Sequence, residues 1–296
     1  MEVMRIEPQT ITHLQEWLGK TESFQDTVSA APVRALSATL DRPDPAPAPG
    51  SFLPELWHWL YFLPHARQSE IGPDGHPHRG GFMPPVPLPR RMWAGSRLQW
   101  LAPLHVGDSI ERVSTIESVT HKAGRTGDLI FVLVKHHISN QQGLALIEEH
   151  DIVYRDAAGP NDKPVAPTPA PTDATWTKLI TPDDVLLFRY SALTFNGHRI
   201  HYDRQYVTEV EGYPGLIVHG PLIATLLVDL VRQSIPSCTL KSFEFRAIRP
   251  TFDINPFSVS AKPDLEKDPS GKTISVWAQD HEGWLTMQAT AILNSF

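Results

Sequence analysis

The sequence predicts an α+β protein that contains two copies of one unit, each with an apolar helix followed by antiparallel strands. Two observations support this prediction. A proline-rich stretch divides the 296 residues into halves of similar length, and the same order of apolar and polar segments occurs in both halves. Hydrophobic residues make up 41% of the chain and charged residues 20%, so there is enough apolar material for a sizeable core.

The clearest helix is predicted at residues 221–232, where a proline occupies the first turn and Pro236 follows the end. The apolar run 53–62 is the corresponding helix candidate of the first half. Strands follow each helix, and a polar turn with one glycine, Gly143 or Gly283, precedes the last strand, which is a hairpin signal. The corresponding strands are 98–103 with 243–250, 129–139 with 273–278, and 144–154 with 284–293.

The proline-rich stretch at residues 156–173 has five prolines and no aromatic residue, so we expect a stiff, solvated linker. It separates an N-terminal domain over residues 1–155 from a C-terminal domain over residues 174–296. Two more proline-rich patches, at 42–50 and 83–90, are expected to be loops because apolar segments resume on both sides.

Composition excludes several classes of function. A net charge of -7 gives no electrostatic reason to bind nucleic acid, and a single cysteine excludes a disulfide framework and a cysteine-based zinc site. The longest apolar stretch, 222–231, is far short of the roughly 20 residues that cross a membrane, and the N-terminus has no leader pattern. We therefore expect a soluble, cytoplasmic protein without a nucleic-acid or membrane partner.

The segment 188–220 concentrates polar residues before the strongest helix. It ends at Gly220, directly before Pro221, where a helix N-terminus offers unpaired N–H groups and the positive end of the dipole. Since glycine has no side chain and proline has no N–H, the Gly220 N–H is the candidate donor for a carbonyl that develops negative charge. His201 is the candidate acid/base, and Asn196 is a candidate to hold a water. The alternative is that the Asn and His residues only cap turns.

The runs 191–203 and 214–221 resemble the MaoC-like acyl-thioester hydratase/dehydratases, and most closely the type 2 3-hydroxyacyl-thioester dehydratase branch, which includes mesaconyl-C4-CoA and itaconyl-CoA hydratases. The resemblance implies a tandem (double) hot dog fold, in which an antiparallel sheet wraps around a central helix. It implies a hydro-lyase that reversibly hydrates an α,β-unsaturated acyl-CoA, with a small dicarboxylic acyl group. No cofactor is expected, since the CoA thioester is the substrate.

Three positions depart from the family motif, Asp-x-Asn-Pro-(Ile/Leu)-His: its Asp falls on Asn196, its Asn on His198 and its Pro on Arg199. His201 matches its histidine, but Asn196 stands at the position of the acidic residue, and amide groups cannot shuttle a proton. We expect Asn196 to orient water or substrate, with Asp203 as a compensating carboxylate if the local backbone is strand-like. Tyr190, His198 and His219 are expected to contact the substrate.

The first half lacks a Gly-Pro helix start, so we expect a degenerate copy that shapes the acyl tunnel. An anionic substrate group needs arginine, and Arg90, Arg91, Arg246 and Arg249 are the candidates. The His-x-His pair at His76 and His78 lacks a cysteine or carboxylate at a ligand spacing, so we expect no metal there.

Two other functions stay open. A hot dog thioesterase needs a carboxylate on or near the central helix, and Asp229 lies more than two turns into that helix. A non-catalytic acyl-thioester-binding protein has no need for His201. Because a tandem chain already holds two units, both a monomer and a homodimer are compatible with the sequence.

Overall fold

The computed structural model describes residues 5–124, 127–156, 166–236 and 238–294. Its strands fall into two groups along the chain. Five belong to the N-terminal half: β1 (Thr21–Thr27), β2 (Arg90–Trp100), β3 (Ser109–Gly124), β4 (Gly127–Asn140) and β5 (Gly143–Arg155). Five belong to the C-terminal half: β6 (Trp176–Ile180), β7 (Leu240–Ala247), β8 (Phe257–Pro263), β9 (Thr273–Gln279) and β10 (Leu285–Leu293).

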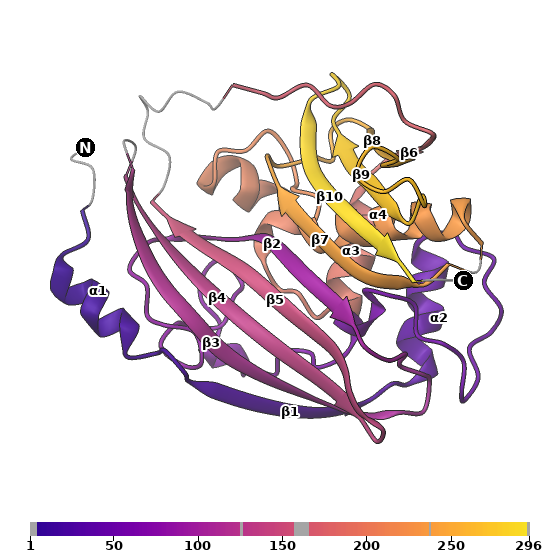
Figure 1. Cartoon of the computed structure of the whole chain (residues 1–296). Helices are drawn as coiled ribbons and strands as arrows, with labels where there is room; N and C mark the ends of the chain where they lie inside the picture. The colour runs from indigo at the N-terminus through magenta and orange to yellow at the C-terminus, as the bar shows by residue number, and fades with distance from the viewer. Residues whose placement is uncertain (1–4, 125–126, 157–165, 237, 295–296) are drawn as a thin grey trace.

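All these strands form one antiparallel sheet with the order β1-β3-β4-β5-β2-β7-β10-β9-β8-β6 (Figure 1). The two halves meet where β2 pairs with β7, from Gly95 opposite Arg246 to Gln99 opposite Ser242. A Cβ atom at Gly95 would lie 2.4 Å from the Phe245 carbonyl oxygen, so the close approach of these two strands requires glycine.

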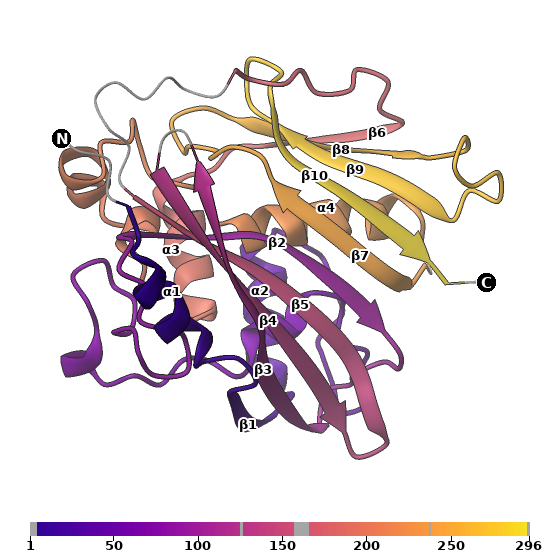
Figure 2. The same cartoon turned by 60° about the vertical axis from the view of Figure 1, so that its left-hand side comes forward.

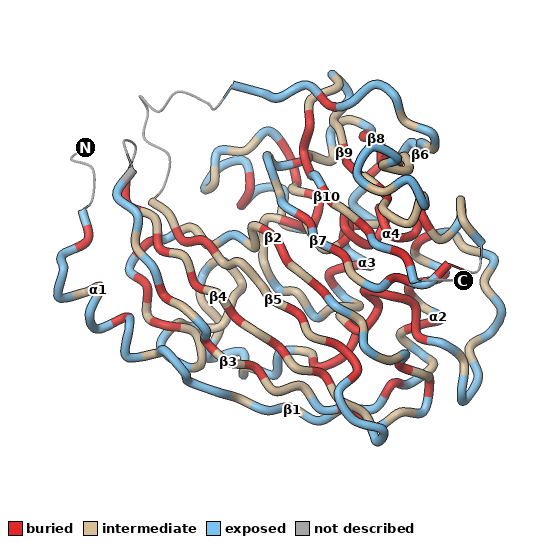
Figure 3. Tube along the Cα trace, viewed as in Figure 1, coloured by how far each residue is buried: buried red, intermediate tan, exposed pale blue. Residues whose placement is uncertain are grey.

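The helices pack against this sheet and against one another. The longest is α4 (Gly220–Ser234), which lies against β6, β8 and β9 (Figure 2). Figure 3 shows it buried along most of its length, and its residues 222–231 are all buried, which explains why apolar side chains surround the whole helix. The others are α1 (Pro8–Gln15), α2 (Ala30–Thr39), α3 (Asp184–Leu193) and the short turns η1 (Trp57–Leu60), η2 (Gln68–Glu70), η3 (Arg199–His201) and η4 (Tyr206–Val210).

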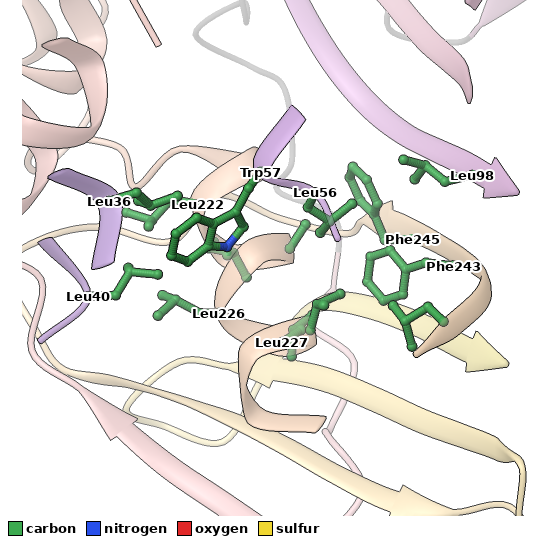
Figure 4. Close-up of a cluster of buried hydrophobic side chains, with 14 of the residues drawn as sticks. Leu36, Leu40, Leu56, Trp57, Leu98, Leu222, Leu226, Leu227, Phe243 and Phe245 are labelled. Carbon is green, nitrogen blue, oxygen red and sulfur yellow. The ribbon is translucent and has the colours of Figure 1, made fainter. Parts of the chain in front are cut away.

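One hydrophobic core extends across both halves. Leu36 of α2 and Trp57 of η1 belong to the same buried cluster as Leu222 of α4 and Phe243 of β7 (Figure 4). Each Å² of buried apolar surface contributes about 25 cal/mol to stability, so this shared core holds the two halves together.

The N-terminal half also buries a carboxylate, Glu148 of β5. Its oxygens accept hydrogen bonds from His58 Nε2 (2.9 Å), Trp59 Nε1 (2.9 Å) and His150 Nε2 (2.6 Å). Burial alone would raise the pKa of Glu148, but the two histidines outweigh it and hold the pKa well below the usual range. Glu148 therefore fixes η1 to the sheet.

The predicted helix at 221–232 and both hairpins are confirmed, and each predicted strand overlaps one that forms, although β2 and β7 both begin and end earlier than predicted. The proline-rich patch at 42–50 is a loop, and so is the patch at 83–90 except for Arg90, which begins β2. The helix predicted at 53–62 is wrong. Leu56 has a φ of 69°, which no α-helix accommodates, and only the four-residue turn η1 forms. The α-helices of that half are α1 and α2 instead, neither of which we predicted. The run 53–62 is apolar because nine of its ten residues are buried, not because it is helical.

Residues 157–165 of the predicted linker lie outside the described residues. Its described end is not fully solvated: the Thr168 carbonyl accepts from the Leu285 N–H (2.8 Å), and Ala170 is buried beside Trp277. The domain boundaries at 155 and 174 stay a prediction. Among the described residues, no helix is long and apolar enough to cross a membrane.

Candidate active site

His201 ends the short turn η3, just before the chain turns toward α4. Its Nδ1 lies 2.7 Å from the Ile217 carbonyl oxygen. Because a carbonyl can only accept, Nδ1 carries the hydrogen and Nε2 keeps a free lone pair. Burial lowers the pKa of His201 to about 4, so the ring is neutral near pH 7. His201 is therefore held in the form that can take a proton from water.

His219 packs against one face of the His201 ring. Its ring stacks on His201 with centroids 3.8 Å apart and an angle of 19° between the planes. Ser191 Oγ lies 2.7 Å from His219 Nε2, and the Tyr190 ring meets the same imidazole edge-on at 5.0 Å. Tyr190 and His219 are both buried; His219 packs directly on His201, and Tyr190 packs against His219.

Gly220 follows His219 directly and begins α4, as predicted. The first helical hydrogen bond runs from the Ile223 N–H to the His219 carbonyl, and no backbone acceptor within the described ranges pairs with the Gly220 N–H. A Cβ atom at Gly220 would meet nothing closer than Met287 Cε at 4.0 Å. Neither packing nor backbone angle requires glycine here, and the missing side chain leaves room for a ligand to approach the start of α4.

The side chains of Asn196 and Asp203 form hydrogen bonds with neighbouring residues of the same segment. The Asn196 side-chain oxygen accepts a hydrogen bond from the His198 N–H (3.0 Å), so Asn196 caps a turn, as the alternative interpretation expected. The NH₂ group of Asn196 is left to bind a water. Asp203 accepts from Arg199 Nε (2.9 Å) and from the Tyr206 N–H (3.0 Å). The local backbone is a 3₁₀ turn rather than a strand, so the condition for Asp203 to compensate is not met.

The sequence prediction missed a loop of the N-terminal half, residues 72–78, that lies against this segment. Asp74 accepts from the ring Nδ1 of His76 (3.1 Å), and the His76 ring lies 4.1 Å from the ring of His198. The His198 ring in turn meets His201 edge-on at 5.4 Å. The Asp-x-His spacing at residues 74 and 76 is the sequence signal that could have indicated this contact. The expectation that no carboxylate accompanies His76 is therefore wrong.

These contacts bring charged groups and partly buried imidazole rings close together. Burial lowers the pKa of His76 to about 4, and burial together with His76 and His201 lowers that of His198. Burial would raise the pKa of Asp74, but the hydrogen bonds from His76 hold it below the usual range. Asp74, His76 and His198 each offer a ligand atom within 4.8 Å of the others, which makes them the described group that could hold a metal ion.

Arg91 on β2 is the predicted arginine that reaches this cluster. Its charge contributes to lowering the pKa values of both His76 and His198, and also lowers that of Tyr154 against the effect of burial. Among the described residues, no carboxylate forms an ion pair with Arg91. A cation beside two histidines and without a carboxylate partner among the described residues is suited to an anionic substrate group.

The other arginines are engaged elsewhere. Arg90 donates to the Glu211 carbonyl oxygen (3.0 Å) and pairs with its carboxylate (3.4 Å). Arg246 is exposed on the face of β7 opposite the core, so the structure does not bring it to His201, contrary to the prediction. Arg249 pairs with Asp280 (3.6 Å) and lines a separate cavity of about 160 Å³.

Asp229, the carboxylate that a thioesterase would need, is also occupied. It is 2% exposed, lies against the Arg42 guanidinium and accepts from Gln233 Nε2 (2.9 Å). A carboxylate fixed in this way in the middle of α4 cannot serve as a base for water at the helix N-terminus.

Comparisons with known proteins agree with this geometry. The family model for hydroxyacyl-thioester dehydratase type 2 matches residues 56–253. The chain is 46% identical over 277 residues to the mesaconyl-C4-CoA hydratase of Chloroflexus aurantiacus, covering 94% of this chain and 96% of the relative. It is 28% identical to the mitochondrial hydroxyacyl-thioester dehydratase type 2 of Schizosaccharomyces pombe, covering 80% of this chain and 88% of the relative.

Solved structures show the same fold at low identity. HtdX of Mycobacterium tuberculosis aligns with a TM-score of 0.62 at 14% identity, over 92% of this chain and 99% of its own. A second protein of that organism, Rv0216, which has a double hot dog fold, aligns with a TM-score of 0.57 at 14% identity, over 94% and 96% of the chains. The predicted double hot dog fold is confirmed. The chain belongs to the hydroxyacyl-thioester dehydratase type 2 family and is a hydro-lyase of acyl thioesters.

Proposed function

We propose that this hydro-lyase adds water reversibly to a small dicarboxylic enoyl-CoA that carries a carboxylate on its β-carbon, as mesaconyl-C4-CoA does. The observation that carries the proposal is Arg91, a cation without a carboxylate partner that lies among the histidines of the site. The 46% identity to a mesaconyl-C4-CoA hydratase supports the same substrate class.

In the proposed reaction, His201 Nε2 accepts a proton from water while the water oxygen bonds to the β-carbon. The electron pair of the double bond moves to the α-carbon and the thioester oxygen, which accepts from the Gly220 N–H. One such donor is worth about 3–4 kcal/mol of transition-state stabilisation. The imidazolium then returns the proton to the α-carbon. The stack of His219 on His201 brings base and donor side by side, because His219 immediately precedes Gly220.

Arg91 accounts for substrate choice in this scheme. A carboxylate on the β-carbon lies next to the carbon that water attacks, so its partner must lie next to the base. A substrate without that carboxylate leaves the guanidinium unpaired in a partly closed site, which costs binding energy. We therefore expect crotonyl-CoA, which has no carboxylate, to be a poorer substrate than mesaconyl-C4-CoA.

The test follows the absorbance of the enoyl thioester with both substrates, alongside an assay for free thiol. We expect loss of the enoyl signal without thiol release, and a preference for mesaconyl-C4-CoA that Arg91→Ala reduces at least 10-fold. Arg246→Ala, on the exposed face of β7, is the matched control and should leave the preference unchanged. Thiol release would indicate a thioesterase instead, and no change in either signal would indicate a binding protein.

The cellular setting is also a proposal. A single cysteine suits a reducing compartment, and we propose the cytoplasm. The chain already pairs two half-sheets through β2 and β7, so activity does not require a second copy, although a homodimer is compatible with the fold.

A further inference from the structure

The loop at residues 72–78 is built to hold one shape. Within it, the Gly72 N–H donates to the His76 carbonyl (2.7 Å) and the Gly75 N–H to the Gly72 carbonyl (3.0 Å). The His78 N–H donates to the Glu70 carbonyl (2.8 Å) at its base. A loop with this many internal hydrogen bonds holds its side chains in fixed positions.

The same loop is fastened to the segment that carries His201. The Arg199 N–H donates to the Asp74 carbonyl (2.9 Å), and the Arg199 guanidinium donates to the Pro73 carbonyl (3.0 Å). Gly75 and Gly197 face each other so closely that a Cβ atom on Gly75 would lie 1.7 Å from the Gly197 carbonyl oxygen. Two glycines thus allow backbone contact between residues more than a hundred positions apart.

This docking delivers an ordered imidazole to the site. The Asp74 carboxylate accepts from the His76 N–H (3.0 Å) and from the ring Nδ1 (3.1 Å). Because the carboxylate is ionised and only accepts, the hydrogen lies on Nδ1 and the Nε2 lone pair is free. His76 therefore has the same form as His201: one nitrogen anchored as a donor, the other free to accept.

We propose that His76, oriented by Asp74, is a second catalytic residue of the site and takes the place of the acidic group that Asn196 replaces in the motif. The proposal rests on the proposed function. The attacking water donates one hydrogen to His201 Nε2 and the other to His76 Nε2, which leaves a lone pair of its oxygen directed at the β-carbon. One O–H bond breaks as the C–O bond forms, and the imidazolium that receives the proton returns it to the α-carbon. Asp74 is a positioning residue that stabilises positive charge on His76.

The geometry favours this role over a metal site. Both Asp74 oxygens already accept from His76, and the rings of His76 and His198 pack against each other with an angle of 46° between their planes. A metal would compete with those bonds, whereas a water that donates to Nε2 leaves them intact.

The test compares His76→Ala and Asp74→Asn with His78→Asn, an exposed histidine of the same loop, in the enoyl-thioester assay. We expect His76→Ala to lower kcat about 100-fold with little change in KM, and added imidazole to restore part of the rate. Asp74→Asn should lower kcat about 10-fold and shift the acidic limb of the pH–rate profile, while His78→Asn keeps the wild-type rate. If His76→Ala does not fold, Asp74→Asn carries the test.

Wild-type kcat for His76→Ala would overturn the proposal, and so would a loss that imidazole does not restore. A third contrary result is wild-type activity that a chelator abolishes and Zn²⁺ restores, because the cluster would then be a metal site. Each of these outcomes leaves wild-type hydration in place. Failure of the proposed function is a different result, since the wild-type protein would then not hydrate the substrates at all.

Discussion

Replacing Gly75 with alanine tests whether the contact between the halves assembles the site. Gly75 has a φ of +91°, and an added Cβ would lie 1.7 Å from the Gly197 carbonyl oxygen, where ordinary contact begins near 3.4 Å. The loop must therefore move by about 1.7 Å, the difference between these distances. Displacement of a catalytic group by about 1 Å can cost 100-fold in rate, so we expect kcat to fall by about that factor or more.

Gly50 provides the matched control. Its φ is +82°, but a Cβ there meets nothing within 4 Å. Gly50→Ala therefore has the same backbone cost of about 1–2 kcal/mol without the collision. Activity and thermal unfolding are measured for both variants. We expect the larger loss of stability in Gly75→Ala, which adds the collision to the backbone cost, and a loss of activity only in that variant; equal activity of the two variants would refute the docking argument.

Further predictions concern stability. Glu148→Ala leaves three donors, one buried and two partly buried, without their acceptor. The free energy of unfolding in urea, followed by tryptophan fluorescence, should therefore fall by about 3–5 kcal/mol; a loss under about 1 kcal/mol would contradict this. Gly95→Ala places a Cβ 2.4 Å from the Phe245 carbonyl oxygen and should lower the melting temperature, which calorimetry measures against wild type. The pKa values of His201 and His76 are lowered to about 4, so the unfolded chain binds more protons in acid. The free energy of unfolding should therefore fall from pH 6.5 toward pH 4 by up to about 1.4 kcal/mol per pH unit for each histidine, and a flat profile would refute their burial as neutral rings.

Local patterns predicted helix α4 and the hairpin turns of both halves, but not α3, β6 or β8. Helix α4 has a proline in its first turn and a long apolar run, and the turns at Gly143 and Gly283 lie between β-rich segments, so each signal is contained within about fifteen residues. His201 and Gly220 could be proposed from sequence for the same reason, because the motif and the helix start lie within about twenty residues of each other.

Signals that depend on distant contacts were missed or misinterpreted. The run 53–62 is apolar because the core of the other half covers it, and periodicity alone does not separate a buried helix from a buried irregular segment. The pairing of Gly75 with Gly197 joins residues more than a hundred positions apart, so no local pattern places His76 beside His198. Arg246 could not be assigned to the exposed face until the direction of β7 relative to the core was known.

The most direct test of the central claim is the reaction of mesaconyl-C4-CoA in D₂O, followed by NMR and a free-thiol assay, for the wild type and His201→Ala. The account predicts a product with a hydroxyl on the β-carbon and one deuterium on the α-carbon, formed at least about 100-fold more slowly by His201→Ala and without free thiol. Release of thiol by the wild type, or an unchanged rate in His201→Ala, would contradict it.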